Sequence, residues 1–141
     1  MSRPDLPLLI GVSREPVYSP GRFFEADRAI LLETATACEA AGARVRILPA
    51  DAPRQAFDGG RLVFTMCQGP ESLETMGWLA DSGVTVVHEP SAILSCHRTR
   101  MLPLLARAGL PRPEARLVAC EDPDREALAL ADQCAESGGW V

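Results

Sequence analysis

The sequence predicts an α/β fold, a parallel sheet of about four strands with helices on both faces. Two observations carry this prediction. Short apolar runs recur along the chain, and segments with helical periodicity separate them. Continuous apolar strands that alternate with helices are typical of a parallel sheet covered on both faces. Right-handed crossovers follow as the default connection.

The first half of the chain supplies two strands and one long helix. Leu8–Val12 is a short apolar run and predicts a buried strand. Ser13–Arg22 follows with two prolines and a glycine and predicts a loop. Arg44–Leu48 predicts the second strand. Between them the apolar residues recur at helical spacing and Gly42 ends the run as a C-cap; these residues are Phe24, Leu31, Ala35 and Cys38.

The next stretch repeats the pattern. Asp51–Gly60 is polar and turn-rich, Leu62–Met66 predicts the third strand, and Val84–Val87 predicts the fourth. One helix is expected between these strands, ending at Gly83, with an apolar face of Leu73, Met76, Gly77 and Ala80. Another is expected over roughly Thr99–Ala108, with Pro103 near its first turn and Leu104, Leu105 and Ala108 on its buried side.

A hinge is predicted at Gly109–Pro113, where two prolines stiffen the connection. It divides the chain into a domain over residues 1–110 and a second segment over 111–141. In that segment Ala115–Ala119 predicts a strand, a helix begins at Asp122-Pro123 and runs to about Glu136, and Trp140-Val141 opens a further strand. The second segment is therefore expected to be an incomplete strand–helix–strand unit.

Composition excludes several function classes. The formal net charge of −5 argues against broad binding of nucleic acid or anionic membranes. The chain has no lysine, which removes Schiff-base chemistry and the lysine-containing phosphate-binding loop. Five widely spaced cysteines without a CxxC pair fit a reducing cytoplasm. No apolar run approaches the ~20 residues of a membrane helix.

Candidate binding residues follow the strands, because ligands of parallel sheets lie at the carboxyl ends of the strands. Ser13 and Glu15 stand in a long first loop, with Arg14 and Arg22 as candidate anion ligands; a solvated loop is the alternative. Gln68-Gly69 follows the third strand, where a glycine lets backbone approach a ligand; a plain turn is the alternative.

Arg98 and Arg100 stand at the entrance of the fourth helix. A cation there is electrostatically unfavourable unless an anion also binds, which indicates phosphate binding; two exposed arginines are the alternative. Cys96-His97 suggests a nucleophile, but adjacent residues seldom align and no orienting acid is evident. His88, Cys96 and His97 match no common metal-ligand spacing, so no metal site is predicted.

From Leu62 to Pro113 the sequence resembles the pre-ATP-grasp domain and hinge of ATP-grasp carboxylate-amine ligases, such as D-alanine–D-alanine ligase, glutathione synthetase and the ribosomal-protein glutamate ligases. The stretches that carry the resemblance come in the family's order: Val63–Gly69, Gly83–Val87, Glu89–Ile93, His97-Arg98, Leu104-Leu105 and Ala108–Pro113.

The resemblance implies a Rossmann-like pre-ATP-grasp domain, followed by the opening of an ATP-grasp domain. Arg98 stands where the family has a lysine that contacts ATP phosphates, and arginine keeps the charge while changing the geometry. Ser13 and Glu15 are placed like residues that hold substrate in the family. The second ATP-binding lysine, the phosphate-covering loop and the magnesium ligands would lie past Val141.

The sequence therefore suggests the N-terminal substrate-binding and dimerisation part of an ATP-dependent ligase that joins a carboxylate to an amine. ATP and magnesium would serve the complete enzyme, and neither cofactor nor activity is expected of this chain alone. Its expected partners are a small carboxylate or amino acid, the rest of the ATP-grasp domain and a second copy. The alternatives are a stand-alone flavodoxin-like binding or regulatory module and a cysteine-dependent enzyme.

Overall fold

The computed structural model describes residues 6–19, 21 and 23–112. By its internal contacts the chain divides into two units, Met1–Leu104 and Leu105–Val141, and each is considered by itself. The expected strands and helix between Ala115 and Val141, and the candidate anion ligand Arg22, lie outside the described residues. Within them, no helix is long and apolar enough to cross a membrane.

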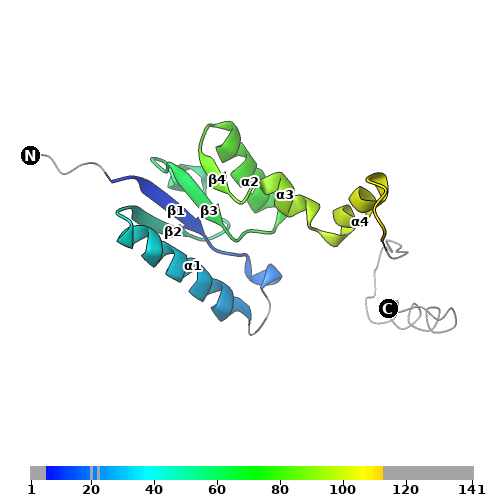
Figure 1. Cartoon of the computed structure of the whole chain (residues 1–141). Coiled ribbons are helices and arrows are strands. Elements are labelled where there is room, and N and C mark those ends of the chain that lie inside the picture. Colours follow the sequence, from blue (N-terminus) through cyan, green and yellow to red (C-terminus); the bar gives the residue numbers. More distant parts are fainter. Residues whose placement is uncertain (1–5, 20, 22, 113–141) are drawn as a thin grey trace, which may run out of the picture. The chain divides into compact units, whose positions relative to one another are not determined.

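Four strands form one parallel sheet, which confirms the predicted α/β fold (Figure 1). They are β1 (Leu8–Val12), β2 (Arg44–Leu48), β3 (Leu62–Thr65) and β4 (Thr85–Val87). The spatial order is β2-β1-β3-β4, and every neighbouring pair is parallel. Because the chain runs from β1 to β2 on one side and from β3 to β4 on the other, the order reverses between β1 and β3. Such a switch point leaves a crevice at the carboxyl ends of the two strands.

Across residues 6–19, 21 and 23–112 the structure has four helices and two short 3₁₀ turns, Pro16–Tyr18 and Arg54–Phe57. Helix α1 (Phe23–Ala40) is followed by Gly42, whose positive φ of 92° suits a glycine at a helix end. Helix α2 (Pro70–Asp81) begins with a proline, which needs no N–H partner there.

Helices α3 (Pro90–Ser95) and α4 (Arg98–Arg107) complete the set. Helix α3 was not expected, because six residues are too few for a clear period. Its start is capped by the Glu89 carboxylate, which accepts hydrogen bonds from the backbone N–H groups of Ser91 and Ala92.

The α2 face of the sheet holds the hydrophobic core. Ile10, Val12 and Val63 point to this side and are fully buried against α2 and the Arg54–Phe57 turn. Helix α2 buries Ser72, Leu73, Met76 and Leu79. The predicted apolar face is therefore half correct: Leu73 and Met76 are buried, but Leu79 takes the place expected for Ala80, which is exposed.

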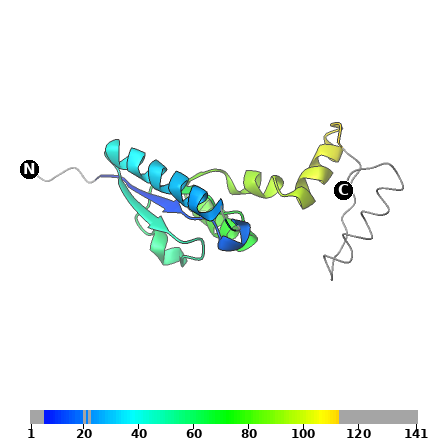
Figure 2. The same cartoon turned by 90° about the horizontal axis from the view of Figure 1, so that it is seen from below.

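The α1 face is covered less completely, because α1 is the one long helix that runs along it (Figure 2) and it buries few residues. Along α1 only Leu31 and Ala35 are buried, whereas Phe24, which shares their helical spacing, is 40% exposed. Strand β4 lies at the sheet edge, and Val87 is 41% exposed. The expectation of a sheet buried on both faces thus fails at β4, because one helix is too narrow to cover four strands.

The expected packing of α4 is also wrong. None of its residues is buried, and Leu104 is 40% exposed. Pro103, expected near the first turn, lies inside the helix. An apolar spacing predicts which residues share a face, but burial also requires a surface for that face to pack on.

Candidate functional site

Two loops meet at the switch point of the sheet. One follows β1 and contains Ser13 and Glu15, and the other follows β3 and contains Gln68 and Gly69. The sequence suggests these four residues for substrate binding. The two pairs stand more than fifty positions apart in the chain, and hydrogen bonds join Glu15 to the Gln68 and Gly69 backbone and Ser13 to the adjacent Cys67. The structure therefore joins the two loops into one site.

The Glu15 carboxylate is the centre of this site. Its Oε2 accepts a hydrogen bond from the Gln68 backbone N–H at 3.0 Å, and its Oε1 accepts one from the Gly69 backbone N–H at 2.9 Å. The Ser72 hydroxyl, in the first turn of α2, also donates to Oε1. Glu15 thus lies where free N–H groups and the helix dipole favour an anion.

The protonation state of Glu15 follows from these contacts. Burial raises the pKa of the carboxyl, but the hydrogen bonds from Ser72, Gln68 and Gly69 lower it more, so that the pKa lies below the ordinary 4.5. Gly69 is needed for the contact, because a Cβ at this position would lie 2.7 Å from Glu15 Oε1. At neutral pH the site therefore contains a fixed carboxylate.

The neighbouring residue, Arg14, binds to the opposite side of the sheet. Its Nη1 lies 3.1 Å from the Asp27 carboxylate of α1, and its Nε donates to the Met66 carbonyl at 3.3 Å. The Ser19 hydroxyl donates to the same carboxylate of Asp27. Consecutive residues of one extended loop thus hold α1 and α2, the helices of the two faces.

Ser13 is held through its backbone. Its N–H donates to the Leu48 carbonyl at 2.9 Å, and its carbonyl accepts a contact from the Cys67 sulfur at 3.5 Å. Burial raises the pKa of the Cys67 thiol to about 11, so this cysteine is protonated at neutral pH and is unsuited to nucleophilic catalysis.

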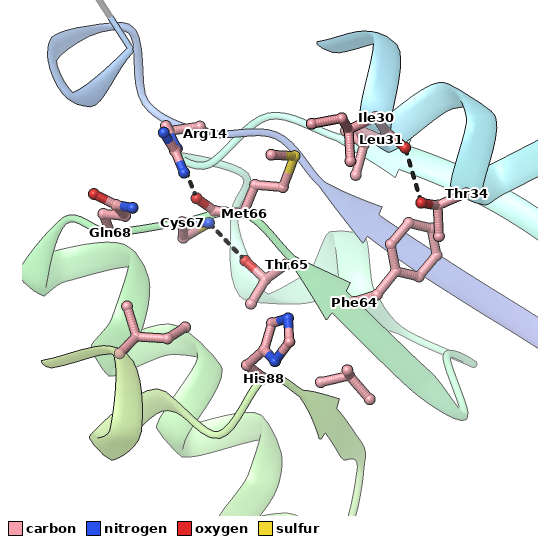
Figure 3. Close-up of a pocket in the computed structure, with 12 residues that line it drawn as sticks. Arg14, Ile30, Leu31, Thr34, Phe64, Thr65, Met66, Cys67, Gln68 and His88 are labelled. Atoms are coloured by element: carbon pink, nitrogen blue, oxygen red, sulfur yellow. Dashed lines mark hydrogen bonds between the residues drawn. The ribbon is translucent and has the colours of Figure 1, made fainter. Parts of the chain in front are cut away.

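A cavity of about 620 Å³ opens beside Glu15. It extends from the β1 loop past the end of β2 to the first turns of α2, and its walls carry more acidic than basic side chains. It is lined by Ser13, Arg14, Glu15, Pro16, Phe24, Pro49, Ala50, Asp51, Ala52, Glu71, Ser72 and Thr75. Two of the four suggested substrate ligands, Ser13 and Glu15, line this cavity. The Gln68 side chain instead lines a second pocket beside β4 (Figure 3).

Arg98 is the first residue of α4 and is exposed. Across residues 6–19, 21 and 23–112, no hydrogen bond or ion pair engages its guanidinium or that of Arg100. Cys96 is exposed, and the His97 ring lies 6.3 Å from that of Tyr18. In the described part of the chain, no three His, Cys, Asp or Glu side chains form a group that could hold a metal ion.

Two partners in this site were missed from the sequence. Ser72 completes the binding of Glu15, and Asp27 pairs with Arg14. A serine in the first turn of a helix is a weak signal of capping. Asp27 gives no signal in the sequence, because an acidic residue near a helix start is common and its partner, Arg14, is thirteen positions away.

Comparison with known proteins gives no family for this chain. No family model matches the sequence, and no curated protein matches it significantly.

Proposed function

We propose that this chain is the N-terminal, substrate-binding part of an ATP-dependent ligase that joins a carboxylate to an amine. The observation that carries the proposal is the Glu15 contact at the switch point, where two separate loops build one polar site beside a large cavity. In a parallel α/β sheet this crevice is the usual place for a ligand. The acidic walls of the cavity favour a substrate with an ammonium group, such as an amino acid.

ATP and magnesium belong to the complete enzyme in this proposal. The exposed Arg98 guanidinium at the start of α4 fits a contact with nucleotide phosphates, since helix N-termini and arginine both bind them. Other residues of the complete enzyme would hold the magnesium ion against these phosphates. A cytoplasmic location and a homodimer are further parts of the same proposal.

The direct test compares this chain with the complete product of its natural reading frame. We expect no release of ADP from ATP by residues 1–141 with any amino acid, and magnesium- and amino-acid-dependent release by the complete protein. The reading frame itself should continue for about 150–200 residues, the size of a further domain. Magnesium-dependent turnover by residues 1–141 alone, or no turnover by the complete protein, would overturn the proposal.

Arg98 tests the nucleotide part. In the complete protein, Arg98→Ala should weaken ATP binding about tenfold or more, as expected for loss of a charge-assisted hydrogen bond. Arg100→Ala is the matched control on the same helix turn and should change the affinity less. Calorimetric titration with a non-hydrolysable ATP analogue measures both. Equal affinities for wild type and Arg98→Ala would show that Arg98 is only a surface residue.

A stand-alone binding module is the second candidate. It is favoured by one observation: the four-stranded parallel sheet with helices is a fold that serves many unrelated functions, binding among them. If the natural chain ends near Val141 and binds a small ligand in the absence of ATP, the protein is such a module and not part of a ligase.

A further inference from the structure

A second pocket, distinct from the Glu15 cavity, lies between α1 and strands β3 and β4 (Figure 3). Its volume is about 350 Å³, within the range of pockets that hold small ligands. Helix α1 contributes Ile30, Leu31 and Thr34. The remaining walls come from β3 and the turn after it, from the end of β4 and from α3, and they are Phe64, Thr65, Met66, Cys67, Gln68, Val87, His88 and Ile93, with Arg14 at the edge.

The body of this pocket is apolar and open to solvent. Ile30 is 56% exposed and Val87 41% exposed, and Phe64 between them is half-buried. Covering such apolar side chains with a ligand is favourable, by roughly 25 cal/mol for each Å² of apolar surface removed from water. The pocket therefore favours a ligand with an apolar body.

The polar groups of the pocket gather at the carboxyl ends of the strands. Arg14, Gln68 and His88 reach it from the ends of β1, β3 and β4 respectively. Within the described residues, neither the Gln68 amide nor the His88 imidazole makes a side-chain hydrogen bond. Arg14 engages Asp27 and Met66 through Nη1 and Nε. The pocket thus combines an apolar body with one end rich in hydrogen-bond donors.

Charge separates this pocket from the Glu15 cavity. Among the lining residues of the pocket there is no Asp or Glu, whereas the Glu15 cavity is lined by three, Glu15, Asp51 and Glu71. Arg14 lines both hollows and its Nη1 is already paired with Asp27, so the difference between them lies in the carboxylates. The pocket without carboxylates, which offers the Gln68 amide and the His88 imidazole, is the one suited to an anion.

We propose that this pocket binds a small carboxylic acid with an apolar body, its carboxylate toward Arg14, Gln68 and His88 and its body against Ile30, Phe64 and Val87. The proposal needs no ATP chemistry and is independent of the ligase function. Its ligand class is also opposite in charge to the ammonium compounds favoured by the Glu15 cavity.

The test is a titration of the 141-residue chain with 3-phenylpropionate, followed by ¹H–¹⁵N NMR, with 3-phenylpropan-1-ol as the uncharged comparison. We expect saturable shifts centred on the amides of Thr65–Gln68 and His88, with a Kd on the order of 1 mM for so small a ligand. The alcohol should bind about tenfold more weakly. No saturable shift, or equal affinity for acid and alcohol, would overturn the proposal.

Two variants locate the site. Thr34→Phe places a ring in the pocket and should abolish binding, whereas Glu33→Phe, the adjacent position outside the lining, should leave the Kd unchanged. Both positions are exposed, so both variants should fold, which a thermal melt checks.

Gln68→Leu keeps the side-chain size but removes the amide. It should weaken binding of the acid about fivefold or more and leave the alcohol unaffected. Unchanged binding of the acid in Thr34→Phe or in Gln68→Leu would show that the ligand lies elsewhere.

Discussion

The two faces of the sheet differ in how completely each is covered. On the α2 face, Ile10, Val12 and Val63 are fully buried, and three core residues of α2 pack over them, Leu73, Met76 and Leu79. On the α1 face, an 18-residue helix buries only two of its own residues and leaves β4 open. The longer helix thus contributes less to the core. Stability is therefore expected to depend mainly on the α2 face, whereas the proposed carboxylate pocket lies on the α1 face.

The largest loss of stability is expected when a side chain is removed from the α2 face. Met76 is fully buried, so Met76→Ala should lower the free energy of unfolding by about 3 kcal/mol, the usual cost of a core cavity. Urea denaturation followed by circular dichroism measures it. A loss below about 1 kcal/mol would show that the α2 face is not the tightly packed one.

The next largest effect is expected where Glu15 anchors α2. Gly69→Ala would place a Cβ 2.7 Å from the Glu15 carboxylate and 3.2 Å from the Tyr18 ring, so the carboxylate must shift away from its hydrogen bonds, at a cost of about 2 kcal/mol. Gly77→Ala in the same helix meets no atom within 4 Å and should stabilise the protein by about 0.5–1 kcal/mol. Thermal melts of both variants are compared. Equal changes of the melting temperature in the two variants would mean that Gly69 has no special steric role.

Glu15→Gln separates the charge of Glu15 from its shape. At pH 7 the variant should lose about 1 kcal/mol, a value reduced by the partial exposure of the carboxylate to solvent. Because the folded-state pKa of Glu15 is lowered, the contribution of the carboxylate is complete above pH 4.5 and is lost as the pH falls through the lowered pKa. The difference between wild type and variant, measured by urea denaturation at several pH values, should therefore shrink in acid. A constant difference would contradict this account.

The smallest effect is expected on the α1 face. Ile30 is more than half exposed, so Ile30→Ala should change the free energy of unfolding by less than about 0.5 kcal/mol, and alanine's higher helix propensity partly offsets the lost contacts. Urea denaturation of Ile30→Ala and Met76→Ala under the same conditions compares the stability lost on the two faces. A loss comparable with that of Met76→Ala would remove the contrast.

Much of the fold was predictable because it depends on local pattern. The ranges of β1 and β2 agree with the predicted strands, and those of β3 and β4 are each one residue shorter than predicted. Helix α1 ends before Gly42 as expected, since a positive φ there suits glycine. The short α3 was missed, because its start depends on the Glu89 side chain folding back onto two N–H groups rather than on any apolar period.

By itself, the sequence determined the alternation of strands and helices, their parallel arrangement, and the set of loops that would gather at the carboxyl edge. These features follow from periodicity, turn residues and the handedness of crossovers, which act over a few residues. Only the tertiary structure decided that Glu15 would occupy the start of α2, that Arg14 would turn instead to α1, and that the β4 side of the sheet would stay open. These outcomes depend on contacts between residues far apart in the chain, and no local pattern records which partner a side chain will meet.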